Sequence, residues 1–161
     1  MDLLQHARDL FAAGRMHDAL EAAQAACDRA PKDGEAWWLL GRISRHTGMP
    51  VASDDAFRRA AQLNDRLAIP HRVSGERFQA LLEEARAALP EPARRRLEPT
   101  TIRAQPMPTA EQVRAGVDPD ALTLRERAPE DVLVLFQVNH ENRSGSEEAL
   151  RALVSRSLTR A

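Results

Sequence analysis

The feature that most constrains the fold of this chain is a match of the chain to itself at a spacing of 34 residues. The matched positions are Leu3 with Trp37, Ala7 with Gly41, Ala19 with Ser53, Ala23 with Phe57, and Ala26 with Ala60. A repeat of this length buries its apolar surface only by stacking on a neighbouring copy. We therefore expect the first part of the chain to form a surface that holds a partner, and not a site for chemistry.

Apolar periodicity predicts two helices in each copy. In residues 2–30 the apolar side chains recur at i, i+3, i+4 and i+7, and Gly14 separates the two helices. Residues 34–64 repeat this plan, with Gly48 at the turn and Pro50 near the start of the next helix. The spacing, the small residues and the turns resemble the tetratricopeptide repeat. This resemblance implies two stacked helical hairpins over residues 1–65.

In the tetratricopeptide family the first helix of each hairpin lines a concave groove. The residues of this chain that the resemblance places there are Leu4 and Arg8 in the first copy and Trp38, Arg42 and Arg45 in the second. Trp and Arg often anchor interfaces, and Arg binds carboxylates well. We expect these five residues to bind a protein or peptide partner, which would be acidic. The alternative is that Trp38 packs on the second half of the chain and that the arginines are solvated.

The second half reads as a small α+β unit after a linker at residues 66–73. Ser74 is placed to cap a helix that runs to Leu89. Strands are expected at residues 100–104, 121–126 and 131–138, a short helix at 109–115, a polar loop at 139–145, and a final helix from Ser146. The fold class predicted for the whole chain is mainly α with a small α+β part.

Several short segments in this half carry a second resemblance. In chain order they are Phe78–Ala85, Leu89-Pro90-Glu91, Thr101-Ile102-Arg103, Gly116-Val117-Asp118-Pro119, Leu122-Thr123-Leu124, Val132–Phe136 and Glu147-Glu148-Ala149-Leu150. Their order resembles the short bacterial zincin-like metallopeptidase family over residues 74–161. That family carries His-Glu-x-x-His on its last helix, where two histidines bind zinc and the glutamate acts on the metal-bound water.

This chain has none of those side chains at the matching positions. Ser155 replaces the first histidine, Arg156 the glutamate and Thr159 the second histidine. The resemblance therefore implies a catalytically inactive domain, and we expect no enzyme activity, no metal and no cofactor. One alternative is a zinc peptidase with an atypical ligand set around His140 and Glu141, although their place in the chain favours a solvated loop. Another is a truncated relic without a partner.

Composition limits the remaining function classes. The 161 residues carry a net charge of −1, so no basic surface for nucleic acid or an anionic membrane is expected. No apolar run is long enough to cross a membrane, and the first residues lack the basic segment of a signal peptide, which favours a cytoplasmic bacterial protein. Cys27, the single cysteine, is expected to be a buried, inert thiol. Because two repeats are marginal by themselves, we expect either the helix after Ser74 to cap them or the chain to form a homo-oligomer.

Overall fold

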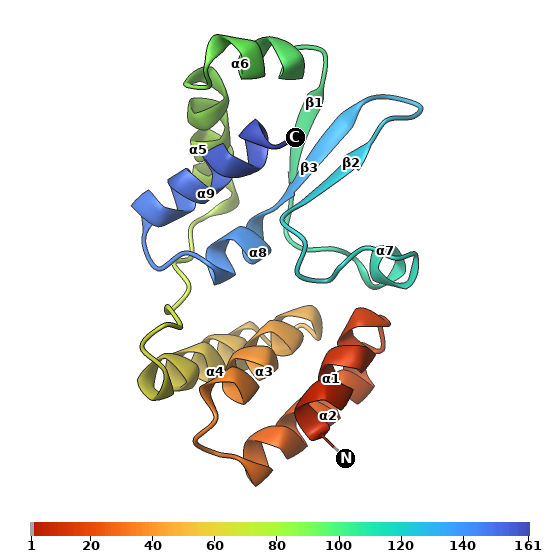
Figure 1. Ribbon diagram of the computed structural model, residues 1–161, viewed down its shortest axis with the longest axis vertical. Coiled ribbons are helices and arrows are strands. Elements are labelled where there is room, and N and C mark those ends of the chain that lie inside the picture. Colours follow the sequence, from red (N-terminus) through yellow and green to blue (C-terminus); the bar gives the residue numbers. More distant parts are fainter. Residues whose placement is uncertain (1) are drawn as a thin grey trace. The chain divides into compact units, whose positions relative to one another are not determined.

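Two separate stretches of chain build the first of two structural units. The computed structural model describes residues 2–161, and its first unit consists of Met1–Pro70 together with Pro108–Pro119. The second unit consists of His71–Met107 and Asp120–Ala161. The secondary structure is mainly helical with one small three-stranded sheet, as predicted (Figure 1). Within residues 2–161 no helix has the length and apolar character needed to cross a bilayer.

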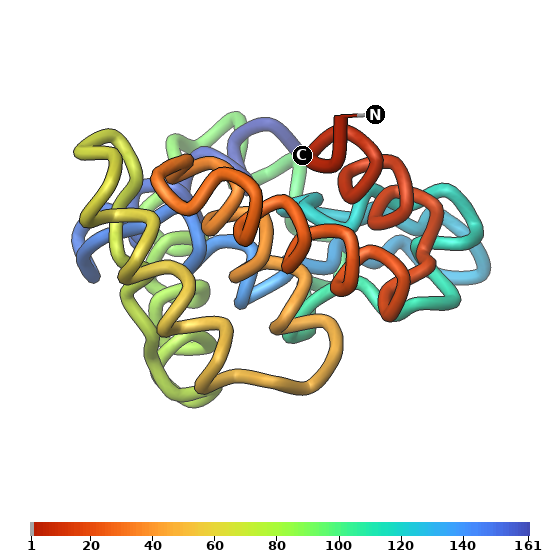
Figure 2. The backbone as a smooth tube through the Cα atoms, turned by 90° about the horizontal axis from the view of Figure 1, so that it is seen from below, coloured from red at the N-terminus to blue at the C-terminus, as the bar shows by residue number. Residues whose placement is uncertain are grey.

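Four consecutive helices form most of the first unit, and Figure 2 follows them along the chain from red to olive. Their bounds are α1 (Leu3–Ala12), α2 (Met16–Arg29), α3 (Gly34–His46) and α4 (Pro50–Leu63), which confirms the two predicted hairpins. The turns within the hairpins need a left-handed residue, and Gly14 and Gly48 supply it with φ values of 79° and 74°. Asp2 and Asp33 cap α1 and α3 through their side-chain oxygens.

The second hairpin depends on a close approach at Gly41. A Cβ atom built on this residue would lie 3.0 Å from three atoms of the Phe57 ring, so any larger residue would require the ring of α4 to move away from the backbone of α3. Next to this contact the Ser53 hydroxyl donates a 2.6 Å hydrogen bond to the Gly41 carbonyl oxygen. The small residues at the matched positions therefore serve close helix packing, which is the role their spacing predicts.

A segment from much later in the chain completes the core of the first unit. Helix α7 (Ala110–Arg114) forms where the sequence predicts a short helix, and a capping box between Thr109 and Gln112 begins it. Val113 of this helix is 2% exposed and belongs to the apolar cluster that contains Leu10, Phe11 and Met16. The sequence analysis predicted the helix but not this location, because the segment falls between two strands of the other unit.

The second unit places a mixed sheet beside helices. Its elements are α5 (Gly75–Ala87), α6 (Glu91–Leu97), β1 (Thr101–Gln105), β2 (Thr123–Glu126), β3 (Val132–Phe136), α8 (Gln137–Asn142) and α9 (Glu147–Thr159). The strand order is β1-β3-β2, with β1 parallel and β2 antiparallel to β3. The central strand is β3, which is paired with a strand on each side. It is also the most apolar strand of the sequence, as expected of a strand in a buried position.

Helices α5 and α9 supply most of the apolar core of this unit. Leu133 and Leu135 of β3 belong to one buried cluster with the apolar side chains of α5 and α9, namely Phe78, Leu81, Leu82, Ala85, Leu150, Val154 and Leu158. The apolar face of α5 is therefore used within the second unit. This corrects the expectation that the helix after Ser74 caps the repeat stack.

The polar segment after β3 also differs from the prediction. Residues 139–145 were expected to form a solvated loop, but 137–142 form α8 and its last five residues are buried. The polar composition misled the prediction, because the side chains of Asn139, His140 and Glu141 are buried and form hydrogen bonds to other protein groups instead of to water.

We predict that Val113→Ala destabilises the protein by about 2 kcal/mol, since it removes two buried carbons and leaves a cavity. Urea denaturation followed by circular dichroism measures the change. Val51→Ala is the matched control, because Val51 is 75% exposed and its truncation should alter stability by less than about 0.5 kcal/mol. Equal effects of the two substitutions would show that α7 is not part of the core.

Gly41→Ala should also destabilise the protein, by about 1–3 kcal/mol, because the added methyl group meets the Phe57 ring. This loss runs against the gain of up to about 1 kcal/mol that alanine normally brings to a helix. Gly75→Ala provides the control, since nothing lies within 4 Å of a Cβ built there. A thermal melt in which both variants are stabilised would contradict the close approach.

Candidate functional site

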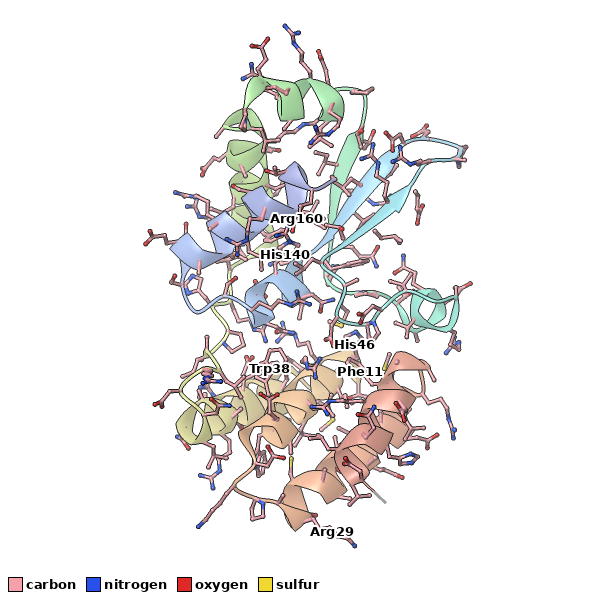
Figure 3. All side chains as sticks on the ribbon, in the orientation of Figure 1. Phe11, Arg29, Trp38, His46, His140 and Arg160 are labelled. Carbon is pink, nitrogen blue, oxygen red and sulfur yellow. The ribbon has the colours of Figure 1, made fainter. Side chains whose placement is uncertain are left out.

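An arginine stacked on aromatic rings marks the surface that the sequence predicts for partner binding. The Arg42 guanidinium lies 4.5 Å from the centroid of the Trp38 ring and 5.9 Å from that of Phe11. Both distances are within the range of a cation–π interaction. The Trp38 ring in turn meets Phe57 edge-on, with centroids 6.0 Å apart. Figure 3 labels Phe11 and Trp38 on α1 and α3.

This stack changes the role expected of Trp38. Its neighbour Trp37 packs against the edge of the apolar core, and the Trp37 indole donates a 2.9 Å hydrogen bond to the Pro31 carbonyl oxygen. Trp38 was expected to bind a partner, but it also contacts Phe57 and supports Arg42 while remaining half-buried. Trp38 therefore holds Arg42 in place as well as offering its own surface.

The structure adds His46 and Phe11 to the predicted residues. The two rings meet edge to face with centroids 5.0 Å apart, and His46 Nδ1 lies 3.2 Å from the Arg42 carbonyl oxygen. The sequence analysis assigned His46 no role in the binding surface. Its position four residues after Arg42, on the same helical face, is the signal that could have identified it.

Two of the predicted arginines carry charge without an acidic partner. Arg8 on α1 and Arg45 on α3 are half-buried, and neither forms an ion pair within residues 2–161. By contrast, Arg15 is paired with Asp18 at 2.6 Å, and Arg58 with Asp55 at 2.9 Å. Arg8 and Arg45 therefore present positive charge that no ion pair neutralises within the described residues.

A hollow lies beside Leu4, the remaining predicted residue. It has a volume of about 350 Å³, and its lining combines apolar side chains with two carboxylates and one guanidinium, namely Leu3, Leu4, Ala26, Ala30 and Ala36 with Asp2, Asp33 and Arg29. Leu4 itself is half-buried and packs at the edge of the apolar core. The hollow can accept an apolar side chain of a ligand one helical turn from Arg8.

The second unit contains a buried polar cluster instead of the expected solvated loop. His140 is fully buried on α8, with Nδ1 2.8 Å from the Phe136 carbonyl oxygen and Nε2 2.8 Å from the Ser157 hydroxyl. The pKa of His140 is lowered to about 4, chiefly by burial and to a smaller extent by the charge of Arg143, while the hydrogen bond to the Phe136 carbonyl opposes this shift. The imidazole is therefore neutral near pH 7.

The neighbouring Glu141 carboxylate is also buried, with 2% of its side chain exposed. It accepts hydrogen bonds from the Arg72 guanidinium at 3.2 Å, the Val73 backbone N–H at 3.0 Å and the Gln137 amide at 3.1 Å. These bonds satisfy both carboxylate oxygens and tie the residues before α5 to α8. A buried charge of this kind is tolerated only because its partners are in place.

These residues do not fit a zinc site. Zinc needs an unprotonated imidazole nitrogen and free carboxylate oxygens, but both His140 nitrogens and both Glu141 oxygens already have partners. On α9, Thr159 donates its hydroxyl hydrogen to the Ser155 carbonyl oxygen, and Arg156 is a cation. Within residues 2–161 no three His, Cys, Asp or Glu side chains gather closely enough to hold a metal ion.

Cys27 lies in the first unit, 2% exposed among alanines, as predicted. Burial, together with the charges of Asp28 and Asp33, raises the pKa of its thiol to about 12. The thiolate that reacts with electrophiles or metals is therefore almost absent near neutral pH.

Comparison with known proteins adds no relative. No protein-family model, no curated protein and no solved structure matches the chain.

Glu141→Gln should destabilise the protein by about 2 kcal/mol, because the amide removes the charge and one of the two acceptor oxygens that bind Arg72 and the Val73 N–H. Chemical denaturation measures the loss. Glu148→Gln makes the same chemical change on the exposed first turn of α9 and should leave stability within about 0.5 kcal/mol of the parent. If the two variants were equally stable, the buried carboxylate would not be holding the segment before α5.

Proposed function

We propose that this protein is a non-enzymatic adaptor that binds an acidic peptide segment on the α1 and α3 helices of a tetratricopeptide-like unit. The observation that carries the proposal is that Arg8 on α1 and Arg45 on α3 form no ion pair within residues 2–161, while Arg42 of α3 stacks on Trp38. The stacked hairpins, the spacing of 34 residues and the Gly41–Phe57 contact support the likeness to that repeat family.

The contacts define the chemistry of the ligand. Arg8 and Arg45 attract carboxylates, and the Trp38 ring offers a rigid apolar surface of the kind that anchors interfaces. Leu4 and the hollow beside it favour one apolar side chain in the ligand. Successive residues of an extended peptide rise about 3.3 Å, so an apolar residue at the hollow would place a carboxylate near Arg8 about two residues away.

We propose that the second unit is a metallopeptidase-like domain that has lost its chemistry, a proposal that rests on the sequence resemblance. Ser155, Arg156 and Thr159 occupy α9, where the family would carry its zinc-binding and catalytic side chains. The zinc-peptidase alternative around His140 and Glu141 finds no support in the geometry, because the polar atoms of both side chains already have hydrogen-bond partners. The proposed role of this unit is therefore structural.

Fluorescence anisotropy with labelled peptides tests the proposal. One peptide carries a leucine followed by alternating acidic residues, and the control has the same length with each acid replaced by its amide. We expect binding of the acidic peptide alone, weakened by added salt as surface ion pairs are screened. Failure of the acidic peptide to bind better than the amide peptide would contradict the proposal.

Arg8→Ala and Arg45→Ala should each weaken binding of the acidic peptide by about fivefold to tenfold, as expected for one lost charge-assisted hydrogen bond of about 1–1.4 kcal/mol. Arg59→Ala is the matched control, because Arg59 lies on the exposed face of α4 and not on α1 or α3. An equal effect of all three substitutions would indicate a general charge effect without a defined site.

A further inference from the structure

A serine on α9 makes a hydrogen bond that the structural role of the second unit leaves unexplained. The Ser157 hydroxyl lies 2.8 Å from His140 Nε2, and the two residues come from different helices, 17 positions apart in the chain. His140 is fully buried, whereas Ser157 remains 8% exposed and lines a cavity. The pair thus joins a buried imidazole to the hydroxyl of a residue that lines a cavity.

The partner of His140 Nδ1 determines whether Ser157 or His140 donates the hydrogen bond between Ser157 Oγ and His140 Nε2. The Phe136 carbonyl oxygen can only accept, so His140 Nδ1 must carry the hydrogen. The neutral imidazole then has an unprotonated Nε2, and the Ser157 O–H must donate to it. This leaves lone pairs on Ser157 Oγ for another atom. A base that is hydrogen-bonded to a hydroxyl and held by a third group is the arrangement that activates nucleophiles.

The cavity beside Ser157 is small and has cations at its edge. Its volume is about 180 Å³, and its walls include Leu122 and Thr123 from the β2 side and Arg156 and Arg160 from the end of α9. Neither arginine forms an ion pair within residues 2–161. The space suits a short acyl group, and the two guanidinium groups favour one that carries a carboxylate.

We propose that Ser157 is a nucleophile, with His140 as its general base, which takes up a short carboxylate-bearing acyl group from an activated ester. This inference is independent of the peptide-binding surface and adds a covalent step in the other unit. It concerns transfer of the acyl group to the protein, so it does not require the metal chemistry of the family that the second unit resembles.

The step balances without a co-reactant. Oγ forms a bond to the acyl carbon while the hydroxyl proton moves to His140 Nε2. The bond from the acyl carbon to the leaving oxygen then breaks, and the leaving alcohol takes the proton from Nε2. The backbone N–H groups around Ser157 are used within α9, so the charge on the carbonyl oxygen is stabilised by Arg156 and Arg160 instead.

Mass spectrometry of the full-length protein after incubation with a fluorophosphonate provides the first test. We expect a single adduct that peptide mapping places on Ser157 and that Ser157→Ala abolishes. Ser155→Ala, two residues earlier on the same helix, should leave the adduct unchanged. Absence of an adduct from the folded parent protein, or an adduct on a different serine, would overturn the proposal whatever the stability of the variants.

The pH profile of labelling identifies the base. Since the pKa of His140 is lowered to about 4, the labelling rate should stay level between about pH 6 and pH 8, whereas a solvent-exposed histidine would give a rise near its ordinary pKa. His140→Gln should slow labelling about 100-fold if the variant folds. A rate that rises through pH 6.5 would show that His140 is not the base.

Selectivity for the acyl group tests the arginines. We expect 4-nitrophenyl succinate to acylate Ser157 about tenfold faster than 4-nitrophenyl acetate, with the preference lost in Arg160→Ala. Arg94→Ala, on the exposed face of α6, is the matched control and should retain it. Equal rates for the two esters in the parent protein would contradict the assignment of a carboxylate-bearing acyl group.

Discussion

The contact between Gly41 and the Phe57 ring determines the arrangement of the surface on which the proposed binding function depends. The absence of a side chain at position 41 brings α4 against α3, and the Phe57 ring that fills this space also meets the edge of Trp38. Trp38 then holds the Arg42 guanidinium on its face. The close approach of α3 and α4 thus positions the Phe57 ring, the Phe57 ring contacts Trp38, and Trp38 supports the Arg42 guanidinium.

The two units differ in whether their buried and half-buried polar groups have partners. In the second unit the Glu141 carboxylate and the His140 imidazole are enclosed, and each of their polar atoms has a partner. In the first unit Arg8 and Arg45 are half-buried and form no ion pair within residues 2–161. A satisfied polar cluster rigidifies a fold, whereas charge without a partner favours binding of a ligand that supplies the opposite charge.

The sequence predicted the helices and strands better than it predicted the contacts between them. Strong periodicity, Gly14, Gly48 and Ser74 located six of the helices, and the apolar β3 was recognised as a strand, because these signals act within a few residues. The burial of His140 was missed because it depends on Ser157, a contact between two helices with no local signature. For the binding surface, the repeat spacing predicted the positions on α1 and α3, but the stacking of Arg42 and the participation of His46 required the three-dimensional packing. The proposed roles themselves remain predictions.

The discontinuity of the first unit has a consequence for synthesis of the chain. A ribosome releases the four helices long before it reaches Val113, yet this residue is part of the same apolar cluster as Phe11. Until then the cluster lacks one of its members and exposes apolar surface that the finished protein covers. Because Pro108–Pro119 lies between β1 and β2, the nascent helices acquire their last core residue only after β1 has been made and before the sheet can close. Completion of either unit therefore depends on a stretch of chain that is translated within the other.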